Sequence, residues 1–189
     1  MGICGIDEAG RGPWAGPVVA AAVILPSMGR PKGLADSKQL TAETREELAL
    51  AIRACAMVGF GAASPTEIDQ LNILQATYLA MRRALEALPQ RPAALLIDGN
   101  AAPDFGLPTE TIVDGDAHVA CISAASIIAK VERDRMMIEL CARHPGYAFS
   151  KHKGYGTPEH QEALARLGPC AIHRLSFKPV RAALEARAA

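Results

Sequence analysis

Two apolar segments of this chain end directly in acidic residues, and this pattern limits what the chain can fold into. Residues 3–6 lead into Asp7 and Glu8, and residues 93–97 lead into Asp98. Continuous apolar runs of this length are typical of strands buried within a sheet. A carboxylate at the end of a buried strand is costly unless a positive group accompanies it. Because Mg²⁺ and Mn²⁺ prefer oxygen ligands, the pattern predicts a site for divalent metal ions.

A fourth acid, Asp116, opens a long predicted helix that covers residues 117–143. The first half of this helix is apolar nearly all round and rich in small residues, so we expect it to pack closely on a sheet in the core. Asp114 lies two residues before Asp116 and would share a face with it on a strand. The residues alone leave open which of the two belongs to the metal site.

Predicted strands alternate with predicted helices along the chain, which indicates an α/β fold. The strands are residues 3–7, 18–25, 58–63, 93–97 and 109–113. Besides the long helix, we expect helices at 41–57, at 65–88 with a break near Asn72, at 158–167 and at 179–188, with a loop at 145–157. Adjacent strand residues point to opposite faces, so Asp7 and Glu8 could share an ion only if the first strand ends or bends there. The glycines that follow permit such a bend.

The composition sets the class of protein. A chain of 189 residues, half of them hydrophobic, is sufficient for one domain with a substantial core. Its apolar stretches are too short to span a bilayer and its N-terminus lacks a signal pattern, so we expect a cytoplasmic enzyme with no membrane association. The five cysteines are scattered and form no CxxC pair, which argues against a zinc site or a disulfide framework.

The zero net charge hides an uneven distribution. Residues 1–129 carry 9 lysines and arginines against 14 acids, whereas residues 130–189 carry 11 against 6. An acidic centre beside a basic segment suits a metal site that works on a polyanion. A solvated basic helix surface accounts for the count equally well.

Several short motifs, in order along nearly the whole chain, closely resemble ribonuclease HII. They are GIDEAGRGP at 5–13, GPVVAAAV at 16–23, DSKQL at 36–40, IDGN at 97–100, GD at 115–116, SAASIIAKV at 123–131, RD at 133–134, HKGYGT at 152–157 and HRLSF at 173–177. The resemblance implies a ribonuclease H-like fold, with a mixed central sheet flanked by helices and a small C-terminal helical part. Residues 1–144 would form the catalytic core, and residues 145–189 would complete the nucleic-acid-binding face of the same domain.

The resemblance also implies an activity. An enzyme of this family hydrolyses the RNA strand of RNA/DNA hybrids and cuts on the 5′ side of single ribonucleotides embedded in duplex DNA. It leaves 3′-hydroxyl and 5′-phosphate ends and acts in ribonucleotide removal from DNA. Two ions of Mg²⁺ or Mn²⁺ in the active complex would activate a water and stabilise the leaving oxygen. The expected partners are these nucleic acids, and the expected state is a monomer. The tail contains no aromatic clamp-binding peptide, so docking on a replication clamp is not expected.

The resemblance assigns roles to individual residues. The four acids Asp7, Glu8, Asp98 and Asp116 match the metal-binding and catalytic set, which favours Asp116 over Asp114. Gly10, Arg11 and Gly12 match the loop that senses the ribose 2′-hydroxyl, the one group that marks a lone ribonucleotide as RNA. Tyr155 matches the tyrosine that packs on the sugar beside the scissile phosphate. The expected phosphate contacts are Ser37, Lys38, Lys151, Lys153 and Arg174. For Ser37 and Lys38 the residues alone favour ordinary loop solvation.

Two other functions would also fit part of this sequence. A junction resolvase of the same fold superfamily would share the acids but would not need a 2′-hydroxyl sensor. A non-catalytic hybrid-binding module would gain nothing from four negative charges placed near phosphates. The Gly-Arg-Gly loop and Tyr155 argue against the first alternative, and the four intact acids argue against the second.

Overall fold

The computed structural model describes residues 2–188, and its centre is a mixed sheet of five strands in the order β3-β2-β1-β4-β5. The strands are β1 (Ile3–Ala9), β2 (Val18–Ile24), β3 (Met57–Ala63), β4 (Ala94–Asp98) and β5 (Thr109–Ile112). β1 to β3 form an antiparallel meander, whereas β4 and β5 run parallel to β1. The expected α/β fold with a mixed sheet is therefore confirmed.

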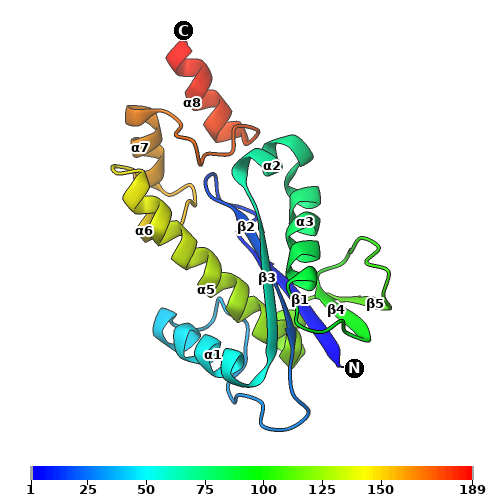
Figure 1. The fold of residues 1–189 in the computed structure, drawn as a ribbon. Helices are drawn as coiled ribbons and strands as arrows, with labels where there is room; N and C mark the ends of the chain where they lie inside the picture. Colours follow the sequence, from blue (N-terminus) through cyan, green and yellow to red (C-terminus); the bar gives the residue numbers. More distant parts are fainter. Residues whose placement is uncertain (1, 189) are drawn as a thin grey trace.

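Helices cover both faces of this sheet (Figure 1). On one face lies α3 (Ile73–Glu86), which packs on β2 and β3. On the other lies α5 (Ala120–Arg143), which packs on β1 and β2 beside α1 (Ala42–Cys55). The contact with α5 is close, because a Cβ added to Gly5 of β1 would lie 2.2 Å from the backbone of Cys121. The small residues of the predicted core helix thus allow it to approach the sheet directly, as expected.

Alternation along β1 decides which face each side chain occupies. Cys4 and Ile6 belong to the apolar cluster under α3. Asp7 therefore points to the α5 face, since successive side chains of a strand alternate. On β4, Leu95 and Ile97 belong to the α3 side, which leaves Asp98 on the α5 face. The sheet thus places these two acids on the same face of adjacent parallel strands.

Local capping sets several helix boundaries as the sequence predicts. Thr41 caps α1, and Ser64 forms a capping box with Glu67 at the start of α2 (Pro65–Leu71). Asn72 ends α2 and caps α3, so the predicted break at that position is confirmed. Thr157 caps α7 (Pro158–Leu167).

Three predicted boundaries are wrong. β1 continues through Asp7 and Glu8 to Ala9 and stays paired with β2 there, so the strand does not end at the two acids. The predicted single helix after Asp116 is divided at Val119 into α4 (Gly115–His118) and α5, because Val119 has an extended backbone. The predicted loop at 145–157 contains a short helix, α6 (Phe149–His152).

The C-terminal part lies beyond the end of α5 and consists of α6, α7 and α8 (Lys178–Ala188) (Figure 1). It joins the core where Ala15 pairs with His173 in an isolated bridge. All five cysteines are free thiols. Among residues 2–188, no helix combines the length and apolar character that crossing a membrane requires.

Candidate active site

Three carboxylates converge where β1 and β4 meet the start of α4. Asp7, Asp98 and Asp116 each offer an oxygen, and these atoms lie within 4.8 Å of one another. Asp7 and Asp116 are buried, and Asp98 is half-buried. Carboxylate oxygens at such spacing form the donor set that hard divalent cations use, so the residues present fit Mg²⁺ or Mn²⁺.

The turn between β5 and α4 brings Asp116 to the sheet. Asp114 adopts the left-handed conformation with φ of 53°, which reverses the chain and exposes its own side chain. The Asp116 backbone N–H then donates to Asp98 Oδ1 at 3.2 Å. Ser123 Oγ donates to the Asp116 carbonyl oxygen at 2.6 Å and holds α4 against α5. Of the two acids that the sequence left open, the structure therefore brings Asp116 into the cluster and leaves Asp114 in solvent.

The surroundings oppose the charge of these acids. Burial raises the pKa of Asp7 well above its ordinary value, and the nearby carboxylates of Glu8 and Asp98 raise it further. Burial likewise raises the pKa of Asp98 and of Glu8. Close buried carboxylates repel one another, so a bound cation would relieve a strain that the protein alone sustains.

Lys38 is a positive group that reaches this cluster. Its Nζ lies 3.3 Å from Asp116 Oδ2, and its side chain is 77% exposed. Partial burial would lower the pKa of Lys38, but the hydrogen bond and the charge of Asp116 raise it above the ordinary value. Ser37 is buried beside it, and its hydroxyl lies 2.8 Å from that of Ser126 on α5.

Glu8 lies apart from the three clustered carboxylates. It follows Asp7 on a continuous strand, so its side chain starts from the opposite face. Its carboxylate pairs instead with Arg11 at 3.2 Å, while it still lines the same pocket as Asp7 and Asp98. The expectation that all four acids hold the metal is thus matched by the positions of three of them.

The glycine loop, residues 10–17 between β1 and β2, forms one wall of the pocket, and Tyr155 stands against it. Gly10, Arg11, Gly12 and Tyr155 all line the pocket that contains the acids. A Cβ at Gly12 would lie 3.8 Å from the Tyr155 ring, which is part of a side chain that is 47% exposed. Gly10 has φ of 94°, and a Cβ there would lie 1.9 Å from Arg133 Nε, so only glycine fits.

Arg174 does not occupy the phosphate-contacting position that we expected. Its side chain is fully buried and donates to the carbonyl oxygens of Gly10, Arg11 and Gly16 at 2.6, 2.9 and 3.0 Å. The guanidinium is therefore fully engaged inside the protein, where it fixes the glycine loop. Burial lowers its pKa to about 9.

Arg133 is a second buried arginine, and sequence reasoning missed its part in the site. It donates to the carbonyl oxygens of Pro17, Lys153 and Ala15 at 3.0, 3.0 and 3.2 Å and so joins the glycine loop to the segment before Tyr155. Arg133 lies in the charged run KVERDR at 130–135, so the residues around it gave no signal of burial.

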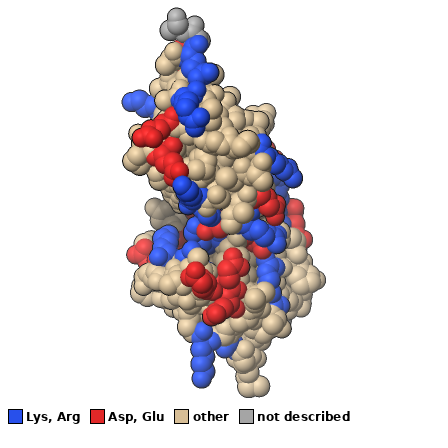
Figure 2. Space-filling view, turned by 90° about the vertical axis from the view of Figure 1, so that its left-hand side faces the viewer, with Lys and Arg blue, Asp and Glu red and all other residues tan. Residues whose placement is uncertain are grey.

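The other expected cationic contacts lie around the rim. Lys151 is exposed and pairs with Glu159 at 3.0 Å. Lys153 is half-buried and its Nζ donates to the carbonyl of Ser150. Lys130, which sequence reasoning did not select, lines the pocket and pairs with Asp134 at 2.6 Å. Asp134 does not belong to the cluster of Asp7, Asp98 and Asp116. On the face drawn in Figure 2, basic side chains occur from one end of the molecule to the other with acidic ones among them.

Comparisons with known proteins identify the family. The family described as Ribonuclease HII matches residues 4–180. A curated ribonuclease HII from Parvibaculum lavamentivorans is 57% identical over 180 residues, which are 95% of this chain and 67% of that protein. The chain belongs to the ribonuclease HII family.

Solved structures agree with this assignment. The ribonuclease H2 from Pyrococcus horikoshii OT3 superimposes with a TM-score of 0.82 at 26% identity, covering 98% of each chain. The ribonuclease HII from Archaeoglobus fulgidus, solved in a complex with PCNA, gives 0.77 at 27% identity and covers 94% of this chain and 96% of that one.

Family membership establishes the general chemistry. The protein is a metal-dependent ribonuclease H enzyme with endoribonuclease activity on RNA/DNA hybrids. The ribonuclease H-like fold predicted from the motifs is confirmed. The two alternatives, a junction resolvase and a non-catalytic binding module, are not supported.

Proposed function

We propose that this enzyme cuts on the 5′ side of single ribonucleotides in duplex DNA, besides acting on RNA/DNA hybrids, and that it removes ribonucleotides from DNA. The observation that carries this proposal is the position of Tyr155 beside Gly12 in the lining of the acidic pocket. A single ribonucleotide differs from its neighbours by one 2′-hydroxyl, so its recognition requires a narrow reader close to the reacting bond. Backbone groups at Gly10 and Gly12 and the Tyr155 ring provide such a reader.

Asp7, Asp98 and Asp116 would hold two ions of Mg²⁺ or Mn²⁺, and Glu8 would join them by leaving Arg11. Bound ions of this kind activate a water and stabilise the leaving 3′ oxygen in an in-line displacement. This chemistry gives 3′-hydroxyl and 5′-phosphate ends. The raised pKa values of Asp7, Glu8 and Asp98 support the assignment, because they indicate carboxylates that need a positive partner.

Lys38 and Arg11 would exchange partners when nucleic acid binds. Each now pairs with an acid of the pocket, and each side chain is at least half exposed. When cations neutralise the acids, both bases are free to contact the phosphate backbone, which contributes most of the affinity. Ser37, Lys151 and Lys153 would extend this contact, so that residues 145–189 complete the nucleic-acid-binding face of the domain.

The proposed function also includes the state of the protein and its place in the cell. The Archaeoglobus fulgidus relative forms a complex with PCNA. We propose that the present enzyme acts as a monomer in the cytoplasm on RNA/DNA hybrids and on DNA that contains ribonucleotides.

The test uses a labelled DNA duplex that contains one ribonucleotide, an all-DNA duplex and a long RNA/DNA hybrid, each in Mg²⁺, in Mn²⁺ and in EDTA. We expect metal-dependent cutting 5′ of the ribonucleotide, with the all-DNA duplex intact. Cutting of the hybrid alone would contradict the proposed recognition by the glycine loop and Tyr155.

A further inference from the structure

Three histidines lie together directly behind the segment that carries Tyr155. They are His152 on α6, His160 on α7 and His173 in the segment before α8. The ring centroids of His152 and His160 are 4.6 Å apart, and those of His160 and His173 are 5.2 Å apart. His160 is fully buried and His173 is 2% exposed. The proposed chemistry uses none of them.

The hydrogen bonds between His173, His160 and Tyr155 have one possible direction when both rings are neutral. The Cys170 backbone N–H can only donate, and it lies 2.9 Å from His173 Nδ1. The proton of His173 is then on Nε2, which lies 3.0 Å from His160 Nε2. The proton of His160 is consequently on Nδ1, which lies 2.9 Å from the Tyr155 carbonyl oxygen. A backbone donor at one end and a carbonyl at the other thus fix both tautomers.

His152 supports the same segment by a separate path. The Gly154 N–H lies 3.2 Å from its Nδ1, so the proton is on Nε2 and donates to the Tyr147 carbonyl oxygen at 2.7 Å. The Tyr155 N–H also donates to the His152 carbonyl oxygen at 2.9 Å. Gly154 and Tyr155 are therefore attached to α6 through His152 and to α7 through His160.

We propose that His160 and His173 are positioning residues that hold Tyr155 over Gly12, a role that rests on the function proposed above. The segment around Tyr155 has no regular secondary structure, and Lys153 and Gly154 both have positive φ. Its placement therefore depends on individual hydrogen bonds. Of the two donors that reach the Tyr155 carbonyl, Thr157 N–H belongs to the same turn, and only His160 links it to another part of the protein.

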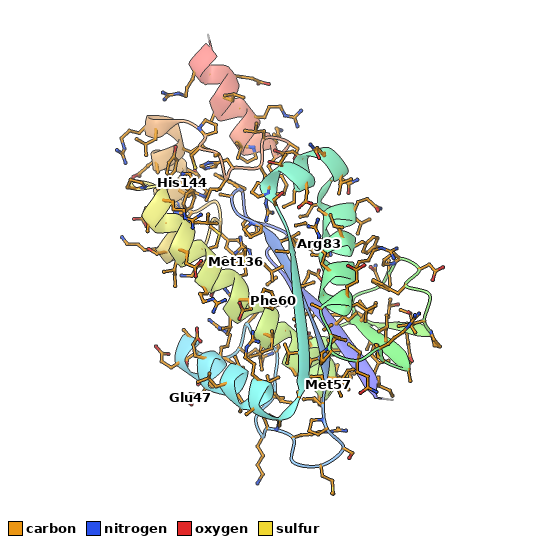
Figure 3. All side chains as sticks on the ribbon, in the orientation of Figure 1. Glu47, Met57, Phe60, Arg83, Met136 and His144 are labelled. Atoms are coloured by element: carbon orange, nitrogen blue, oxygen red, sulfur yellow. The ribbon has the colours of Figure 1, made fainter. Side chains whose placement is uncertain are left out.

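The hydrogen-bond chain requires both rings to be neutral, because a second proton would place N–H against N–H between the two Nε2 atoms. Burial lowers the pKa of His160 and lowers that of His173 to about 4, which keeps both rings neutral at physiological pH. The titratable groups that face them from the packed elements are His152 on α6, Tyr147 and Cys170 in the adjoining segments, and His144. Figure 3 labels His144 at the end of α5.

The first experiment measures tautomers in the whole protein without metal or substrate. Long-range ¹H–¹⁵N NMR correlation at pH 7.5 is expected to place the ring proton of His173 on Nε2 and that of His160 on Nδ1. A charged ring, or a proton on His160 Nε2, would overturn the proposal whatever the activity of the enzyme.

The second experiment measures single-turnover cutting of DNA that contains one ribonucleotide. His160→Phe keeps the bulk but removes the donor, and we expect a loss of about tenfold, the worth of one hydrogen bond. His160→Asn places an amide N–H where Nδ1 was and is expected to stay within about threefold of the original rate. His144→Gln, a histidine outside the chain of hydrogen bonds, is the matched control and is expected to cut at the original rate.

A double variant tests whether His160 acts through Tyr155. Once Tyr155→Ala is present, adding His160→Phe should slow cutting no further, because the group being positioned is gone. Additive losses, or equal losses in His160→Phe and His160→Asn, would overturn the positioning role. Equal rates for Tyr155→Ala and the unmodified enzyme would instead overturn the proposed function, even with the tautomers as assigned.

Discussion

Removal of one carboxylate charge should stabilise the metal-free enzyme. Asp7 is 4% exposed, and its oxygen lies within 4.8 Å of oxygens of Asp98 and Asp116. At an effective dielectric constant of about 20, each ionised pair at this distance repels by about 3 kcal/mol. The ion pair between Lys38 and Asp116, together with partial protonation of the carboxylates, offsets much of this repulsion. We therefore expect the free energy of unfolding of Asp7→Asn to be about 1–2 kcal/mol higher than that of the unmodified enzyme in EDTA near neutral pH. For a chain of this size that gain raises Tm by about 2–8 °C.

The sign of the pH dependence follows from the raised pKa of Asp7. The folded protein holds this proton more tightly than the unfolded chain, so ionisation of Asp7 costs stability as the pH rises above about 3.9, its pKa in the unfolded chain. The advantage of Asp7→Asn should therefore be absent at strongly acid pH, grow as the pH rises and level off above the pKa of the folded state.

Metal should reverse the order of stability. A ligand at about 100 times its Kd stabilises a protein by about 2.7 kcal/mol, and Asp7→Asn lacks one of the three clustered carboxylates. In saturating Mn²⁺ the unmodified enzyme should therefore become more stable than Asp7→Asn. The variant should also have lost its nuclease activity.

The assay is urea denaturation followed by circular dichroism, in EDTA and in Mn²⁺, across a range of pH. Asp114→Asn is the matched control: it removes an exposed acid two residues from Asp116, at a left-handed position that asparagine tolerates. We expect it to change neither stability nor metal response. A clear loss of stability for Asp7→Asn in EDTA would refute the view that the acids are held in mutual repulsion until metal binds.

Three further predictions concern the surroundings of the acids. Arg174→Met should cost about 2–4 kcal/mol in urea denaturation, because three carbonyls lose a charged donor, and a cost below about 1 kcal/mol would show that the glycine loop holds itself. Tyr155→Ala should slow cutting at a single ribonucleotide by about tenfold or more while cutting of long hybrids falls less, and an equal fall on both substrates would remove its role in sugar recognition. His173 has a pKa of about 4 in the folded protein against about 6.5 in the unfolded chain. The stability that the neutral ring contributes should therefore be complete above pH 6.5 and be lost as the pH falls toward 4. The loss should reach about 3 kcal/mol, measured as the stability of the unmodified enzyme relative to His173→Asn at each pH, and a constant difference would contradict the assignment.

The sequence predicted those parts of the site that depend on local order along the chain. The apolar runs ending in Asp7 and Asp98 are strands, and parallel pairing of β1 with β4 brings the two acids together. Side-chain alternation did not reveal that β1 continues past Glu8, because register with β2 decides where the strand ends. The break at Val119 was equally hidden, since no proline or glycine marks it and His118, Val119 and Ala120 can all continue a helix.

Buried arginines show why the remaining part of the site could not be predicted. Arg133 lies 116 residues from Pro17, and Arg174 lies 164 residues from Gly10, yet Arg133 donates to the Pro17 carbonyl oxygen and Arg174 to the Gly10 carbonyl oxygen. Nothing near either arginine in the sequence distinguishes a donor to distant carbonyls from a cation that binds phosphate. The distinction has a functional consequence: two positive charges without carboxylate partners lie beneath the loop proposed to read the sugar. They fix its carbonyls, so the proposed contacts with the phosphate backbone depend instead on more exposed cations such as Arg11, Lys38 and Lys151.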